Sequence, residues 1–76
     1  MRLDKFLKQT KLVKRRVMAK AMADVGRILK DGRPLKPSYE VKPGDELELR
    51  FFSKRLVIRV TEEFEVEVLS SSKEGL

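Results

Sequence analysis

The chain has 76 residues, a formal net charge of +6 at pH 7, and neither cysteine nor histidine. A chain of this length forms one domain with a small core. The missing residue types exclude disulfide bonds, zinc sites built on Cys or His, and histidine as a general base. Charge begins at Arg2, and no apolar run reaches the roughly 20 residues of a membrane span. We therefore expect a cytoplasmic, monomeric protein with no membrane contact, cofactor or bound metal.

The positive charge is concentrated in the N-terminal half. Residues 1–36 carry twelve Lys or Arg against three Asp, a net of +9, whereas residues 37–76 carry a net of −3. A surface this positive at one end usually meets a polyanion, most often a phosphate backbone. The alternative is a solvated surface whose charge is simply uneven.

Two helices are expected in the basic half. The first spans residues 2–8, because Leu3, Phe6 and Leu7 fall on one apolar stripe. Three basic residues lie off that stripe: Arg2, Lys5 and Lys8.

The second helix is expected to begin at an N-cap at Thr10 and to run to about Val25, before the helix-stopping Gly26. Ala19 and Ala23 fall on its basic arc, where they could pack on the first helix or let another surface approach closely. The opposite arc is apolar and holds Val13, Val17, Met18, Ala21, Met22 and Val25.

After Gly26 the pattern changes to short strands. Residues 27–30 form a strand candidate that ends in the tight-turn pair Asp31-Gly32. Residues 46–51 alternate between polar and apolar, as a half-buried strand does, and residues 56–60 and 64–68 are further strand candidates.

The predicted fold class is therefore α+β, with two N-terminal helices packed on a small antiparallel sheet of three to five strands. The domain is expected to span residues 1–69, with a core motif at about 1–50 and a β extension at 51–69. The polar residues 70–76 are expected to form a disordered tail.

An ordered series of short motifs makes this pattern more specific. They are the helical run at residues 2–7, the basic run at 14–16, Gly-Arg-Ile at 26–28, Asp-Gly at 31–32 and Pro-Gly-Asp at 43–45. Together they resemble the αL RNA-binding motif, the domain type that is named for a ribosomal protein of the small subunit. The turn keeps Asp-Gly where that family often has Asn-Gly.

A short αL motif with a β extension is similar to the heat-shock protein 15 family. The runs at residues 1–8 and 14–16 are particularly similar to its short bacterial branch, RqcP. This resemblance implies a non-enzymatic RNA-binding factor of ribosome-associated quality control. It implies binding to obstructed large ribosomal subunits through large-subunit rRNA and peptidyl-tRNA. It also implies support for C-terminal alanine tailing of stalled nascent chains by a partner protein that recruits alanyl-tRNA.

The candidate RNA-binding residues are mostly basic. Arginine can bind two phosphate oxygens at once, and lysine adds point-charge attraction and salt dependence. Asp4 could instead hydrogen-bond a base or ribose, hold Arg15 or Arg16 in position, or cap the first helix. The complete set is Arg2, Asp4, Lys5, Lys8, Lys14, Arg15, Arg16, Lys20, Arg27 and Lys30.

Other residues leave alternatives open. Tyr39, Phe51 and Phe52 could stack a base, although core packing is the commoner fate of such aromatic residues. An acidic run at residues 62–67 is a weak signal for metal or acid–base chemistry, and an exposed acidic strand could instead serve a protein-interaction module; its acids are Glu62, Glu63, Glu65 and Glu67. A heat-shock-type factor that recycles large subunits, or a generic structured-RNA binder, is the alternative function.

Overall fold

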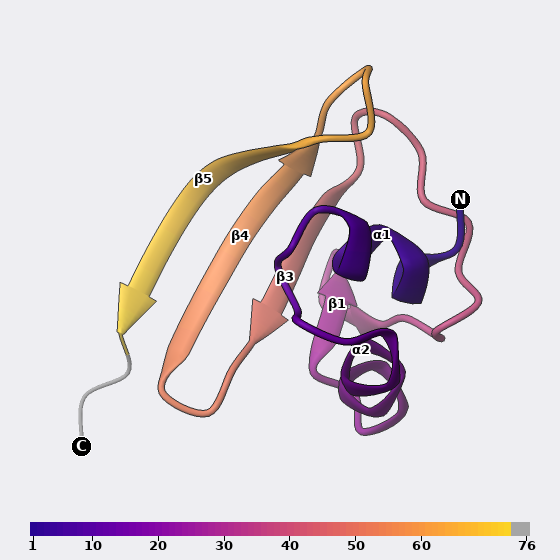
Figure 1. The fold of residues 1–76 in the computed structure, drawn as a ribbon. Helices are drawn as coiled ribbons and strands as arrows, with labels where there is room; N and C mark the ends of the chain where they lie inside the picture. Colours follow the sequence, from indigo (N-terminus) through magenta and orange to yellow (C-terminus); the bar gives the residue numbers. More distant parts are fainter. Residues whose placement is uncertain (74–76) are drawn as a thin grey trace.

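The computed structural model describes residues 1–73 and contains two short helices and a five-stranded antiparallel sheet (Figure 1). This is the predicted α+β class. In the described part of the chain, both helices are too short and too polar to span a bilayer. The elements are α1 (Leu3–Gln9), α2 (Arg16–Asp24), β1 (Ile28–Lys30), β2 (Arg33–Pro34), β3 (Glu46–Arg50), β4 (Lys54–Val60) and β5 (Val66–Lys73).

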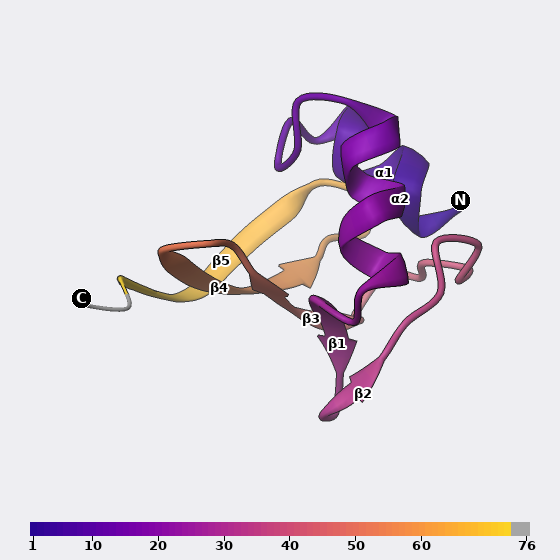
Figure 2. The ribbon, with the colours of Figure 1, turned by 90° about the horizontal axis from the view of Figure 1, so that it is seen from below.

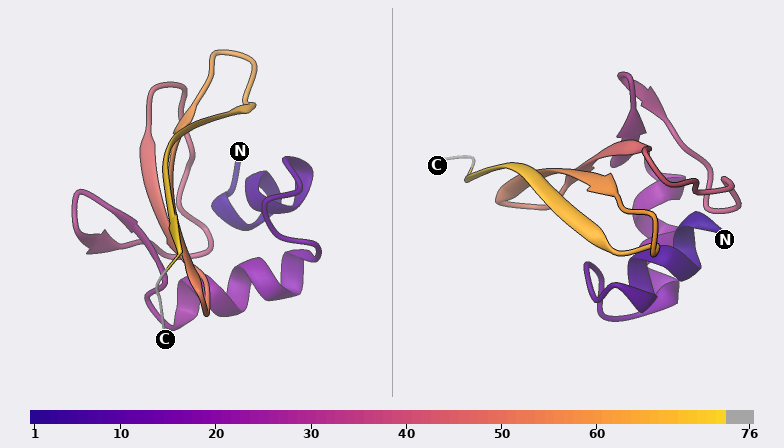
Figure 3. Two further views of the ribbon diagram at one scale, coloured as in Figure 1. Left: turned by 90° about the vertical axis from the view of Figure 1, so that its left-hand side faces the viewer. Right: turned by 90° about the horizontal axis from the view of Figure 1, so that it is seen from above.

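The strands follow the order β2-β1-β3-β4-β5 in the sheet. Both helices lie on the same side of it, next to β1 and β3 (Figures 1 and 3). The β1–β2 hairpin and the β4–β5 ribbon lead away from the helices in different directions (Figure 2). The helical pair is therefore held over one end of the sheet, with its outer face uncovered.

The last strand is longer than the sequence predicts. Residues 70–73, expected in a disordered tail, continue β5 and pair with β4 from Val57 to Lys54. The serines of this segment are exposed, and their strand is fixed by backbone pairing to β4 and not by burial. Residues 74–76 of the expected tail lie outside the described residues.

The core forms between α1 and the sheet. Leu3, Phe6 and Leu7 are fully buried, which confirms the apolar stripe of the first helix. In β3, Leu47 and Leu49 are also fully buried and alternate with more exposed charged neighbours, as predicted. Burying one such side chain stabilises the fold by about 1.5–3 kcal/mol, so these few residues account for much of the stability of a small domain.

The second helix begins later than predicted. Thr10 does not cap it but ends α1, where its Oγ1 donates a hydrogen bond to the carbonyl oxygen of Phe6 at 2.8 Å. Lys11 follows with a φ of 64°, a left-handed conformation that stops a helix. The chain then runs as a loop until Arg15 caps α2 with extended backbone.

The face of α2 that packs on α1 is the one with small residues. Ala19 and Ala23 are buried, whereas Val17 and Val25 on the apolar arc are 78% and 68% exposed. Of the two roles open to the alanines, the structure shows packing within the protein. Small side chains allow the two helices to approach closely, and the larger apolar residues remain on the surface.

Ala19→Leu is expected to destabilise the fold by about 1–3 kcal/mol, because the added atoms overpack the contact between the helices. The same substitution at the exposed Ala21 should change stability by less than about 0.5 kcal/mol. Urea denaturation of both variants measures the difference, and equal stability of the two would contradict the packing described.

Candidate RNA-binding surface

A buried carboxylate joins two arginines from different elements. Arg2 donates from Nε and Nη2 to the Asp4 oxygens at 3.3 and 3.2 Å, and Arg16 Nη2 lies 3.3 Å from Asp4 Oδ1. The Asp4 side chain is only 4% exposed, whereas the arginine side chains are 50% and 51% exposed. Asp4 therefore holds the two guanidinium groups side by side at the surface, where both remain accessible.

The ionised form of Asp4 is favoured by these contacts. Burial raises the pKa of the carboxyl, but the hydrogen bonds from Arg2 and from the Lys5 backbone N–H and the charge of Arg16 outweigh burial and lower the pKa below its ordinary value. Asp4 is thus a permanent anion near neutral pH. Of the three roles open to it, the structure favours positioning of arginine, because a buried carboxylate cannot reach a base or ribose.

More basic residues surround this pair. Lys5 and Lys8 lie one turn apart on the exposed side of α1, and Lys20 lies one turn after Arg16 on α2. The exposed Lys11, which the candidate set omitted, lies in the loop between the helices and could have been found by its charge alone. We call the following exposed residues the basic face: Arg2, Lys5, Lys8, Lys14, Arg15, Arg16 and Lys20.

Lys30 does not join the basic face. Its Nζ lies 2.9 Å from Asp45 Oδ1 and 3.3 Å from the Tyr39 hydroxyl, which in turn donates to Asp45 Oδ2 at 2.8 Å. The hydrogen bond to Asp45 is the main cause that raises the pKa of Lys30. The structure therefore places the candidate residue Lys30 in an ion pair within the protein, and the Tyr39 hydroxyl is held in the same network.

This network should make the free energy of unfolding depend on pH in the acid range. Burial raises the pKa of Asp45, but hydrogen bonds from Lys30, the Lys42 backbone and Tyr39 lower it by more. The pKa of Asp45 in the folded protein is therefore below the ordinary value of 3.8. A lowered pKa stabilises the fold above the unfolded pKa, and this contribution disappears as the pH falls through the folded value. Asp45→Asn should therefore destabilise the protein at pH 7 and much less at pH 2, as measured by urea denaturation. A pH-independent difference would contradict the ion pair.

Arg27 lies on a different part of the surface. Its Nη1 donates to the carbonyl oxygen of Arg50 at 3.3 Å, and it lines a shallow hollow with Met18 and Phe52. On the helical wheel Met18 lies on the flank of α2 opposite to Lys20. Arg27 is therefore separated from the basic face, which its candidate assignment did not anticipate.

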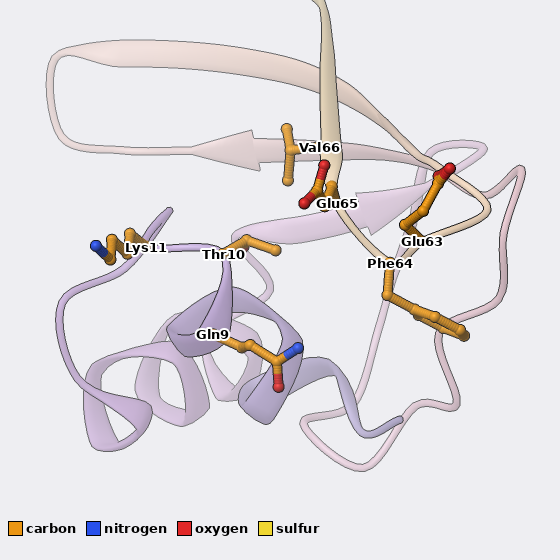
Figure 4. A pocket seen from close by; sticks show the side chains of 7 residues that line it. All are labelled: Gln9, Thr10, Lys11, Glu63, Phe64, Glu65 and Val66. Atoms are coloured by element: carbon orange, nitrogen blue, oxygen red, sulfur yellow. The ribbon is translucent and has the colours of Figure 1, made fainter.

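A second hollow lies between the C-terminal end of α1 and the turn that precedes β5 (Figure 4). Glu63 and Glu65 line one side of it, and Gln9 and Lys11 line the other. The two carboxylates disfavour a phosphate ligand. Within residues 1–73, no cluster of acids has the arrangement of a metal site.

Two short helices with a basic outer face, packed on an antiparallel sheet, define a small nucleic-acid-binding domain, and residues 1–47 match the S4 domain family. The chain is 55% identical to the RQC P-site tRNA stabilizing factor of Bacillus subtilis, over 82% of this chain and 72% of that protein. It is 47% identical to the factor of the same name from Streptococcus pneumoniae, over 82% and 70%.

The fold has a solved counterpart. The trimeric structure of Vibrio cholerae heat shock protein 15 superposes with a TM-score of 0.74 and 28% identity, over 99% of this chain and 70% of that chain. The resemblance to the αL motif and to the heat-shock protein 15 and RqcP proteins is thus confirmed. The chain belongs to the S4-domain family of RQC P-site tRNA stabilizing factors.

Proposed function

We propose that this protein is a non-enzymatic RNA-binding factor of ribosome-associated quality control. It binds obstructed large ribosomal subunits in the cytoplasm as a monomer, through rRNA and the P-site tRNA, and so supports C-terminal alanine tailing of the stalled chain. The observation that carries this proposal is the pair of accessible arginines that Asp4 holds together. The names of the curated relatives, which refer to P-site tRNA, support the choice of RNA.

The pair is suited to phosphate. A guanidinium group has five N–H donors, and Arg2 uses two of them for Asp4, which leaves three for an RNA phosphate. Because Asp4 fixes the geometry in advance, less side-chain freedom is lost on binding. Folded RNA hides its base edges in a deep groove and is recognised mainly by its shape and backbone, which a rigid pair of basic helices can contact.

The basic face also offers a way to stabilise a tRNA. Its residues come from α1, from the connecting loop and from α2, so it can contact two neighbouring phosphate backbones at once. A protein that bridges rRNA and tRNA lowers the dissociation rate of the tRNA by adding contacts, without any chemical step. Retention of the tRNA in turn keeps the nascent chain attached while alanine is added.

Arg16→Ala is expected to lower association with large ribosomal subunits by about tenfold, because it removes one charge-assisted phosphate contact. Co-sedimentation with large subunits in a sucrose gradient measures the loss, and circular dichroism checks the fold.

Arg59→Ala is the matched control, since this exposed arginine on β4 pairs with Glu46 and Glu67 and lies outside the basic face. It removes the same charge and should leave co-sedimentation nearly unchanged. Equal losses in the two variants would reduce the effect to net charge and would count against a specific face.

The identity of the cargo separates this function from generic RNA binding. Gentle purification of the protein from growing cells, followed by sequencing of the bound RNA, should return large-subunit rRNA together with tRNA. Other structured RNA in the purified complex would instead identify a different target for the same basic face.

A further inference from the structure

An exposed apolar patch lies outside the basic face. It forms where the flank of α2 meets the turn between β3 and β4, and it surrounds a shallow hollow. Phe52 is 89% exposed and Met18 is 50% exposed. We call it the Met–Phe patch; its residues are Met18, Met22, Arg27, Arg50, Phe51 and Phe52.

The fold does not need this exposure. Phe51, which directly follows β3, packs against the core, whereas Phe52 in the turn points to solvent. A polar residue would satisfy the turn equally well at position 52. Exposed aromatic and methionine side chains that gather at one hollow are a common sign of an interaction site.

The composition of the patch favours a protein partner over RNA. Aromatic residues, Met and Arg are enriched in protein–protein interfaces, whereas Lys, Glu and Asp are depleted. Methionine side chains adapt to the shape of an apolar partner. A base-stacking site would instead place several exposed aromatic rings along a basic groove. Of the two rings that line this hollow, Phe51 packs against the core, and the exposed Phe52 is bordered by thioethers.

The charge of the patch limits the partner further. Both charged residues that line the hollow are arginines, and in the described chain no carboxylate lines it. Arg50 is partly neutralised by Glu48, whose Oε2 accepts from its Nε at 2.6 Å. Arg27 is anchored by its bond to the Arg50 carbonyl and keeps its other N–H donors free for a carboxylate.

We propose that the Met–Phe patch docks an amphipathic, acidic segment of a partner protein. Apolar side chains of the segment lie against Met18 and Phe52, and a carboxylate within one turn of them pairs with Arg27. Because the patch lies on the flank of α2 away from Lys20, the partner can bind while the basic face is occupied. This inference does not depend on the identity of the RNA.

The test places a photoreactive p-benzoylphenylalanine at position 52 of the full chain, in the cells that naturally make it. The aromatic character of the site is kept, and ultraviolet light links the side chain to whatever lies on it. The adduct is treated separately with nuclease and with protease, and the linked segment is identified by mass spectrometry. The same group at the exposed Glu62 is the control for random contact.

The proposal predicts a nuclease-resistant adduct to a protein segment that carries Asp or Glu within a turn of the linked residue. Met18→Ser and Arg27→Glu should each reduce that adduct by about tenfold. Met18→Ser, which alters no charge, should leave circular dichroism and co-sedimentation with large subunits unchanged. An RNA adduct, a segment without acidic residues, an adduct insensitive to both substitutions, or a yield no higher than at position 62 would overturn it. Loss of co-sedimentation alone would bear on the basic face and not on this patch.

Discussion

Asp4→Asn is expected to weaken RNA binding by about tenfold, although it makes a basic surface more positive. Asparagine keeps the shape of the side chain but loses the charge that pairs with Arg2 and Arg16. Each freed arginine must then be ordered on binding, at about 0.5–1.5 kcal/mol per side chain. Two such costs are comparable to the about 1.4 kcal/mol of a tenfold change. The effect is measured by fluorescence anisotropy, which monitors binding of the labelled protein to purified large subunits at a fixed salt concentration.

A matched control separates geometry from charge. Glu63→Gln also removes one carboxylate, from an exposed position near the turn before β5 and outside the basic face. It should leave RNA binding unchanged or make it slightly tighter, because one negative charge that repels the RNA phosphates is lost. If Asp4→Asn also bound as tightly as the wild-type protein, positioning by Asp4 would be excluded and only the total charge would matter.

Local sequence patterns were sufficient to predict most of the fold. The spacing of Leu3, Phe6 and Leu7 depends only on the period of a helix, and all three are buried where expected. The alternation of Leu47 and Leu49 with charged residues depends only on the period of a strand. Such patterns arise between neighbours along the chain, so they can be read without knowing what packs against them.

Two features of the backbone were not predicted. Thr10 looks like a helix N-cap, but the left-handed Lys11 beside it ends α1 instead. Ser70 to Ser72 look like a polar tail, yet β4 supplies the backbone partners that make them a strand. Thr10 is held at the end of α1 by local bonds to the Phe6 carbonyl. Only the serine strand depends on a partner distant in the sequence.

The same limit applies to the site. Charge identified Arg16 and Lys30 equally well as candidates, but it could not show how each is used. Arg16 lies beside a buried acid and stays half exposed, whereas Lys30 is bound to Asp45 and Tyr39. The sequence contains both acids without any indication of which basic residue each would meet, because those pairs form only when the helices and the sheet are assembled.

Phe6→Ala is expected to have the largest effect on stability. Phe6 is fully buried in the core between α1 and the sheet, and truncating a buried Phe to Ala costs about 3–5 kcal/mol through lost burial and the cavity left behind. A domain of this size is stabilised by only about 0.05–0.15 kcal/mol per residue. The variant should therefore lose a large share of its free energy of unfolding, as urea denaturation followed by circular dichroism would show.

Phe52→Ala makes the same chemical change at a residue that is 89% exposed. Its free energy of unfolding should fall by less than about 0.5 kcal/mol, because the ring makes little contact with the core. Both variants remove the same apolar side chain, so the difference between their free energies of unfolding measures the effect of burial alone. A large loss of stability in Phe52→Ala would mean that the Met–Phe patch supports the fold itself, and its exposure would then need no partner to explain it.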